Sequence, residues 1–144
     1  MSLKDGTKKM SKSDPSDQSR INLTDTKEQI LNKIKKAKTD SAQLPQNDND
    51  IIKRPELVNL YGIFSSIQNQ NLNKTINHFR GKNFSEFKNK LAEVLVEKIY
   101  PISNEIKKLL KDEKYIDNIL QTGSIEAEKI ARKKVNDIKQ KVGF

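Results

Sequence analysis

Hydrophobic positions recur every three or four residues from about residue 30 onward, which is the spacing of one face of an α-helix. The first such stripe follows Asp25, where Asp25 or Thr24 could cap a helix and Glu28 stands three residues beyond Asp25 as a capping-box partner. We expect this helix to end at the Thr-Asp-Ser run of residues 39–41. Its stripe consists of Ile30, Leu31, Ile34 and Ala37.

Three more stripes occupy the middle of the chain. Pro55 suits the first turn of a helix, because its missing N–H would be unpaired there anyway. A short helix is expected over residues 72–79, and the longest stripe runs over residues 84–110. Pro101 lies inside that long stripe, but the stripe keeps its phase, so we expect a kink near Tyr100 and not two helices.

The last thirty or so residues predict two helices. One covers residues 115–120 and ends at Gly123, and Ser124 caps the other. Gly143 suits the left-handed position that closes a helix. The apolar stripe of this last helix is Ala127, Ala131, Val135, Ile138 and Val142.

The remaining segments are polar. Residues 1–20 contain turn formers and no helical stripe, which is typical of a loop. Residues 42–53 are rich in Gln, Asn, Asp and Pro and predict a disordered internal loop. Strand patterns are nearly absent, so we predict an all-α helical bundle behind a flexible N-terminal loop.

Composition narrows the class of protein. The chain has 144 residues, enough for one modest core, with 33% hydrophobic and 33% charged residues. It has no cysteine, which excludes disulfides and thiolate metal sites. No apolar run approaches the roughly 20 residues of a membrane span, so we expect a cytoplasmic protein with no membrane partner. The net charge of +9 favours a polyanion such as nucleic acid, but solvated lysine-rich faces explain it almost as well.

The segment Lys9-Met10-Ser11-Lys12-Ser13, followed by Asp14-Pro15, carries the clearest chemical signal. Two ammonium groups three residues apart on a loop suit a site where negative charge accumulates on a departing polyphosphate. The small serines let the backbone come close and can add hydroxyl contacts. Taken as a bare pattern, the same residues are more often a solvated lysine-rich loop.

The surrounding residues resemble the tryptophanyl-tRNA synthetase family of class I aminoacyl-tRNA synthetases, of bacterial type. The segment of residues 8–15 resembles the signature loop of that family, and Met1-Ser2-Leu3 resembles its lead-in. The resemblance continues in register to residue 144. Glu56 and Asn83 depart from the family pattern, each standing where glycine is common, and Asn83 tolerates the left-handed region that such a turn uses. The other matching runs are the Thr-Asp-Ser of residues 39–41, Arg54-Pro55, Asn59-Leu60-Tyr61, Gly81-Lys82, Phe84, Phe87-Lys88, Leu91-Ala92, Pro101-Ile102, Gly123 and Ala127.

The resemblance implies a parent enzyme that activates tryptophan with ATP and Mg²⁺, transfers it to the tryptophan-specific tRNA, and forms a homodimer. It implies that Lys9 and Lys12 are catalytic, that residues 9–13 bind ATP, and that Met10 packs against the catalytic body. Residues 1–23 would end the catalytic domain, and residues 24–144 would form a C-terminal anticodon-recognition domain. We expect the nucleotide-binding sheet to precede Met1, an internal methionine of the parent, and the chain alone to be inactive and without a cofactor.

Other candidate residues have simpler interpretations. His78 is the only histidine, so we expect a surface or partly buried side chain and no metal site. The aromatic side chains on the stripes are expected in the core and not as base-stacking platforms. Asp14 and Asp17 stand among loop formers, which favours capping over acid–base catalysis. These aromatic residues are Tyr61, Phe64, Phe84 and Phe87.

Two basic clusters are candidates for contact with tRNA phosphates, although either could be a solvated surface. One lies near the end of the long helix and the other on the last helix. Two further classes of function remain open: a free-standing basic helical RNA-binding module and a helical protein-interaction adaptor. The basic residues are Lys107, Lys108 and Lys111 in the first cluster and Lys129, Arg132, Lys133 and Lys134 in the second.

Overall fold

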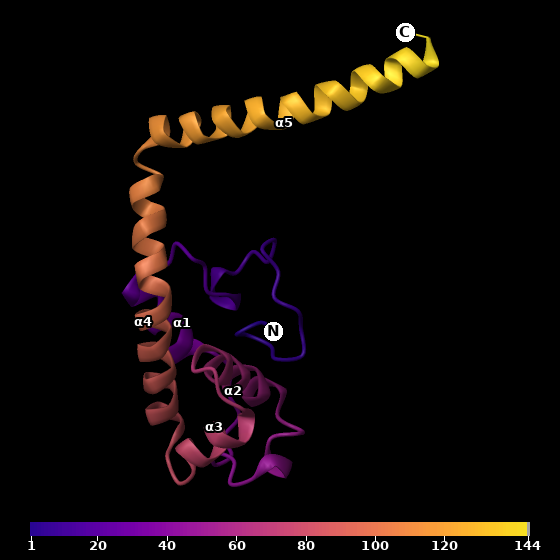
Figure 1. Ribbon diagram of the computed structural model, residues 1–144. Coiled ribbons are helices and arrows are strands. Elements are labelled where there is room, and N and C mark those ends of the chain that lie inside the picture. Colours follow the sequence, from indigo (N-terminus) through magenta and orange to yellow (C-terminus); the bar gives the residue numbers. More distant parts are fainter. Residues whose placement is uncertain (144) are drawn as a thin grey trace. The chain divides into compact units, whose positions relative to one another are not determined.

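The computed structural model describes residues 1–143, which form helices, turns and loops without a strand (Figure 1). The predicted all-α class is therefore confirmed. The α-helices are α1 (Lys27–Lys36), α2 (Pro55–Ile67), α3 (Leu72–Phe79), α4 (Phe84–Leu109) and α5 (Glu113–Val142), and two short 3₁₀ turns are η1 (Asp17–Ser19) and η2 (Asp48–Asp50).

The chain divides into two compact units. The first covers Met1–Asn104 and the second begins at Glu105. The first unit holds both the N-terminal loop and helices α1 to α3, so the proposed domain boundary between residues 23 and 24 stays a prediction. Within residues 1–143, no helix has the length and apolarity required to cross a membrane.

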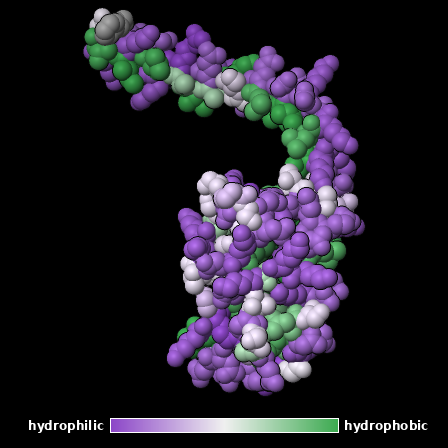
Figure 2. All heavy atoms as spheres, turned by 180° about the vertical axis from the view of Figure 1, so that it is seen from behind, coloured by the Kyte–Doolittle hydropathy of each residue, from purple (hydrophilic) through white to green (hydrophobic). Residues whose placement is uncertain are grey.

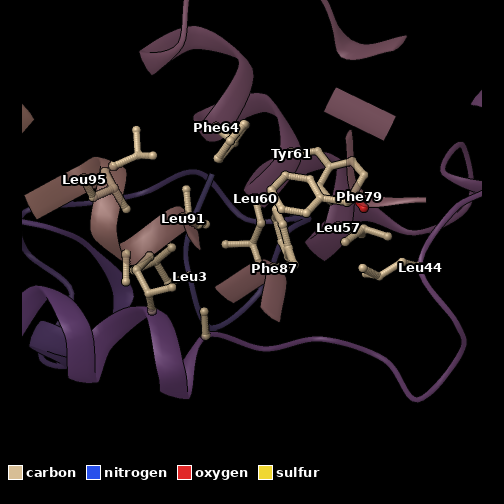
Figure 3. Close-up of a cluster of buried hydrophobic side chains, with 14 of the residues drawn as sticks. Leu3, Leu44, Leu57, Leu60, Tyr61, Phe64, Phe79, Phe87, Leu91 and Leu95 are labelled. Atoms are coloured by element: carbon tan, nitrogen blue, oxygen red, sulfur yellow. The ribbon is translucent and has the colours of Figure 1, made fainter. Parts of the chain in front are cut away.

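The core of the first unit is built around an aromatic cluster (Figure 3). The Tyr61 and Phe87 rings meet edge to face at 4.6 Å, and Phe79 meets Phe64 at 4.9 Å and Phe87 at 4.8 Å. These residues come from α2, α3 and α4, so the cluster joins three helices. The prediction that the aromatic residues form the core is confirmed, with Phe84 only partly buried at its edge.

Helix α1 begins later than the sequence predicted. Thr26 is its N-cap, and the capping box is completed by Gln29 and not by Glu28. The side chain of Thr26 accepts from the Gln29 N–H at 3.2 Å, and the Thr26 N–H donates to Gln29 Oε1 at 2.7 Å. Asp25 does not cap the helix because its carboxylate pairs with the buried Lys33. The helix ends at Lys36, before the Thr-Asp-Ser run.

Helix α4 continues through Pro101 as one helix, as predicted; the kink near Tyr100 stays a prediction. Its buried face is shorter than its apolar pattern, because Ile102 and Leu109 are exposed, as is Leu110 just beyond its end. At the start of the helix, Asn83 and Glu86 cap each other reciprocally, at 3.0 and 2.9 Å. Among residues 1–143, Asn69 is the only non-glycine residue with positive φ, so Asn83 acts as a cap and not as a left-handed turn residue.

Helix α5 corrects the prediction of two separate C-terminal helices. It runs without a break through Gly123 and Ser124 and closes at Gly143, whose φ of 83° is left-handed as predicted. A glycine inside a helix costs only about 1 kcal/mol relative to alanine, which does not force a break. No described residue of α5 is buried, and apolar side chains lie along it in Figure 2.

Residues 42–53 are folded, which corrects the prediction of a disordered loop. Leu44 and Ile51 are buried in the core of the first unit. Arg54 holds the segment through a bidentate pair with Asp40, at 2.6 and 2.8 Å, and a hydrogen bond to the Gln43 carbonyl at 2.7 Å. The Thr-Asp-Ser run thus supplies the carboxylate that anchors the loop to the start of α2.

Candidate functional site: a lysine loop on a helical base

The candidate signature loop, residues 8–15, exposes both of its predicted catalytic cations. Lys9 and Lys12 are exposed, as is Met10 between them. Ser11 and Ser13 share a hydroxyl–hydroxyl hydrogen bond of 2.8 Å, and the Ser13 N–H donates to Ser11 Oγ at 3.2 Å. These bonds form a tight turn that carries Lys12. Among residues 1–143, neither Lys9 nor Lys12 has an ion-pair partner, so both charges are available to an external anion.

The segment before the loop is attached to the helical body. Leu3 is buried in the core, and its N–H donates to the Ser19 carbonyl at 2.8 Å. The Leu3 carbonyl accepts from the Lys38 N–H at 2.8 Å, just beyond α1. The Ser2 N–H donates to the Lys8 carbonyl at 2.9 Å. The first residue of the loop is therefore held in place, while the lysines that follow it project outward.

Gly6 makes this attachment possible. Its α-carbon lies so close to α2 that an added β-carbon would stand 2.5 Å from the Glu56 nitrogen and from the Pro55 carbonyl group. A side chain cannot fit in that space. Glu56 also pairs with Lys38 at 2.8 Å, and this hydrogen bond lowers the pKa of Glu56.

Two aspartates near the loop have different roles. Asp14 forms a local turn, because its Oδ1 accepts from the Ser16 N–H at 2.8 Å, but it does not cap η1, whose N-cap is Ser16. Asp17 is not a cap either; its carboxylate pairs with Lys33 at 2.7 Å and with Arg20 at 3.3 Å. The hydrogen bond from Lys33, followed by that from Asn22, lowers the pKa of Asp17.

Sequence reasoning did not identify Arg20 or Lys33 as site residues. Lys33 lies on α1, eight residues after Asp25, and its side chain is 2% exposed. A lysine in a helix with several other lysines gives no local signal of burial. The pairing of Lys33 with Asp17 and Asp25 is seen only in the folded structure, where α1 lies beside these aspartates.

The residues of the predicted basic clusters are exposed, except for the half-buried Lys107, and the two clusters lie at the end of α4 and on α5. Lys107 and Lys108 lie in the last turn of α4, and Lys108 pairs with Glu105 at 3.1 Å. In the α5 cluster, Arg132 pairs with Glu128 on the same helix. The structure describes no contact that joins the two clusters. Lys111 precedes α5, and the α5 cluster also contains Lys129, Lys133 and Lys134.

His78 is exposed on α3, as predicted, with its ring 4.6 Å from Phe79. Partial burial, together with the charges of Lys82 and Lys90, lowers its pKa, so the ring is neutral near pH 7. Residues 1–143 contain no group of three or more side chains suited to hold a metal ion.

Comparisons with known proteins agree with the resemblance. A tryptophan–tRNA ligase of Agrobacterium fabrum (strain C58) is 47% identical over the whole chain, which covers 41% of that protein. The ligase of Rickettsia felis is 44% identical, again over the whole chain, which covers 43% of it. The crystal structure of tryptophanyl-tRNA synthetase from Mycoplasma pneumoniae matches the whole chain, which covers 43% of that protein, at 27% identity with a TM-score of 0.77.

The extent of these matches defines what they show. The chain spans about two fifths of the length of the curated relatives it matches. The sequence model of the tRNA synthetases class I (W and Y) matches residues 1–101, which include the lysine loop and most of α4. The chain therefore belongs to the W and Y family of class I tRNA synthetases.

Proposed function

We propose that this chain acts as part of a tryptophan–tRNA ligase, in which Lys9 and Lys12 stabilise the pyrophosphate that leaves ATP. The observation that carries the proposal is the pair of exposed, unpartnered lysines on a loop whose first residue is held by the Ser2 N–H. The similarity to tryptophan–tRNA ligases over the whole chain supports tryptophan as the amino acid.

The chemistry requires cations that act late. The tryptophan carboxylate attacks the α-phosphorus of ATP, and the bond from that phosphorus to the bridging oxygen of pyrophosphate breaks. Negative charge grows on the leaving oxygens as this bond lengthens. Lysine ammonium groups that meet those oxygens in the transition state raise the rate without tightening ground-state binding of ATP.

Each loop residue has a part in this proposal. Lys9 and Lys12 supply the charge, and Ser11 and Ser13 shape the turn through their shared hydrogen bond. Met10 packs against the catalytic body of the full-length enzyme. We assign no residue of this chain to Mg²⁺, which in this proposal accompanies the ATP phosphates.

Lys12→Ala in the full-length ligase tests the role of the loop. We expect the single-turnover rate of tryptophanyl-adenylate formation to fall about a hundredfold, with little change in the dissociation constant of ATP. Lys4→Ala is the matched control, because Lys4 is an exposed lysine of the same N-terminal segment but lies outside the signature loop. An unchanged rate in Lys12→Ala would refute the proposed role, and the isolated chain should show no activity in the same assay.

We also propose that the basic clusters of α4 and α5 contact tRNA phosphates. The supporting observation is that the lysines of both clusters are exposed or half-buried, and that Lys129 and Lys133 form no ion pair with an acidic side chain among residues 1–143. Replacing Lys129 and Lys133 by alanine should weaken tRNA binding and reduce the slope of log affinity against log salt by about 1 for each phosphate that is no longer neutralised. Lys90→Ala, at an exposed lysine of α4 outside both clusters, should leave the slope unchanged.

The two rival classes of function predict other outcomes. A free-standing RNA-binding module would bind tRNA with a steep salt dependence but would belong to no ligase. A protein-interaction adaptor would show no salt-dependent tRNA binding. The family match over residues 1–101 favours the ligase over both.

A further inference from the structure

Arg20 reaches the signature loop from outside it. Its Nη1 donates to the carbonyl oxygens of Ser11 at 3.3 Å and Asp14 at 3.1 Å. These carbonyls stand on either side of Lys12 and Ser13 in the chain. One guanidinium therefore holds the backbone before and after Lys12.

The guanidinium of Arg20 is itself oriented by other side chains. Its Nε donates to Asn22 Oδ1 at 3.1 Å, and its Nη2 pairs with Asp17 Oδ1 at 3.3 Å. The side chain is only 17% exposed. Because the group is planar and its donors have fixed directions, its contacts with Asn22 and Asp17 determine where Nη1 points. A lysine could not make this set of contacts.

The partners of Arg20, Asp17 and Asn22, contact a buried ion pair between Lys33 and Asp25. Lys33 Nζ on α1 lies 2.6 Å from Asp25 Oδ2 and 2.7 Å from Asp17 Oδ2. Asn22 connects the two aspartates, donating from Nδ2 to Asp17 at 2.7 Å and from its N–H to Asp25 at 2.9 Å. A buried ammonium is tolerated only when it is paired and hydrogen-bonded. This requirement fixes both carboxylates relative to α1.

Helix α4 also contacts this group of residues, through Ser103. Ser103, which is fully buried, donates from Oγ to the Asp25 carbonyl at 2.9 Å. The contacts thus lead from the loop carbonyls through Arg20 and Asp17 to Lys33 on α1, and through Asp25 to α4. Every contact lies within the first compact unit.

We propose that Arg20 is a positioning residue for pyrophosphate release. It fixes the Ser11 and Asp14 carbonyls on either side of Lys12, and it is itself fixed through Asp17 and Asn22, which contact the buried Lys33–Asp25 pair. Its own charge is already paired with Asp17, so it acts through the loop backbone and does not contact phosphate. The inference rests on the proposed function of Lys12. A displacement of about 1 Å in a catalytic group can cost a hundredfold in rate, which sets the scale of the effect.

The test uses Arg20→Met and Arg20→Lys in the full-length ligase. In Arg20→Met the single-turnover rate of adenylate formation should fall about 10- to 100-fold, while the dissociation constant of ATP should stay within about twofold. Arg20→Lys keeps the charge near Asp17 but cannot hold both carbonyls, so it should also slow the step, by at least about threefold.

Arg54→Met is the matched control. Arg54 is similarly buried, at 14% exposed, and also combines a carboxylate pair with hydrogen bonds to loop carbonyls, those of Gln43 and Ala42. It organises a different loop, so its replacement should cost stability without slowing adenylate formation. Equal slowing by Arg54→Met and Arg20→Met would show a general structural effect and overturn the proposal.

A double-mutant cycle separates positioning from a structural role. If Arg20 acts through Lys12, then Arg20→Met should slow the reaction by less than about threefold once Lys12 is already alanine. The same factor in both backgrounds would overturn the proposal, as would a full rate in Arg20→Lys. If Arg20→Met fails to fold, the cycle with Arg20→Lys gives the same decision. If Lys12→Ala alone has no effect, the proposed function itself fails.

Discussion

Gly6→Ala tests how the N-terminal segment is attached to α2. The new methyl group would lie 2.5 Å from the Glu56 nitrogen and the Pro55 carbonyl group. These are backbone atoms at the start of a helix packed in the core, so they cannot move aside as a flexible side chain could. Overpacking of this kind costs about 1–3 kcal/mol. Loss of backbone freedom in the unfolded chain returns about 0.4–1 kcal/mol, so we expect a net loss near 1–2 kcal/mol.

The clash can be relieved by detachment of the segment, which has its own signature. Leu3 would leave the core, and the bonds from its N–H to Ser19 and from the Lys38 N–H to its carbonyl would open. Hydrogen exchange at the Leu3 and Lys38 amides should therefore accelerate. Urea unfolding followed by circular dichroism would give the change in the free energy of unfolding.

Gly62→Ala is the control for this experiment. Gly62 lies inside α2, and no atom lies within 4 Å of where its β-carbon would stand. Alanine there should stabilise the helix by about 0.5–1 kcal/mol. If Gly6→Ala behaves like Gly62→Ala, with a gain in stability and unchanged exchange at Leu3, then the close approach to α2 is not formed and the reasoning is refuted.

Three further predictions concern stability. Lys33→Met should lower the free energy of unfolding, measured by urea unfolding, by about 3–5 kcal/mol, because it leaves the buried Asp25 carboxylate without its counter-charge; an unchanged free energy of unfolding would contradict this cause. The hydrogen bonds from Arg54 lower the pKa of Asp40 in the folded protein. The stabilisation that Asp40 contributes is therefore present above the pKa of an unfolded aspartate and is lost as the pH falls below about 4, through the pKa of Asp40 in the folded protein. The free energy of unfolding of Asp40→Asn should depend less on pH in that range, and an unchanged pH dependence would contradict the pairing. Gly123→Ala should stabilise α5 by about 1 kcal/mol and so raise its helix content and thermal midpoint, whereas Gly143→Ala, at φ 83°, should lower both. A loss of helix content in Gly123→Ala would contradict one continuous helix and support two separate ones.

Local sequence rules predicted the helices where neighbouring residues decide the outcome. Pro55 starts α2 and Gly143 ends α5 as expected: proline loses no hydrogen bond in the first turn of a helix, and glycine adopts a left-handed φ that other residues tolerate poorly. They were wrong where long-range contacts compete. Asp25 had the spacing of a cap, but a buried lysine eight residues later takes its carboxylate and leaves Thr26 to cap α1.

The apolar pattern overestimated the buried surface near the C-terminus. Ile102 and Leu109 continue the stripe of α4, yet both are exposed, and no described residue of α5 is buried. Periodicity shows which face of a helix is apolar. It does not show whether another part of the protein covers that face, since this depends on what is packed beside it.

The amino-acid sequence by itself determined the all-α class, the lysine loop and the family, because each depends on residue identity and short-range spacing. Only the tertiary structure decided how the loop is held. Gly6 lies against α2, and Arg20 is connected through Asp17 to the Lys33–Asp25 pair. The spacing of these residues along the chain does not indicate that they are in contact. The physical reason is that a buried charge or a close backbone contact is defined by what folding brings next to it.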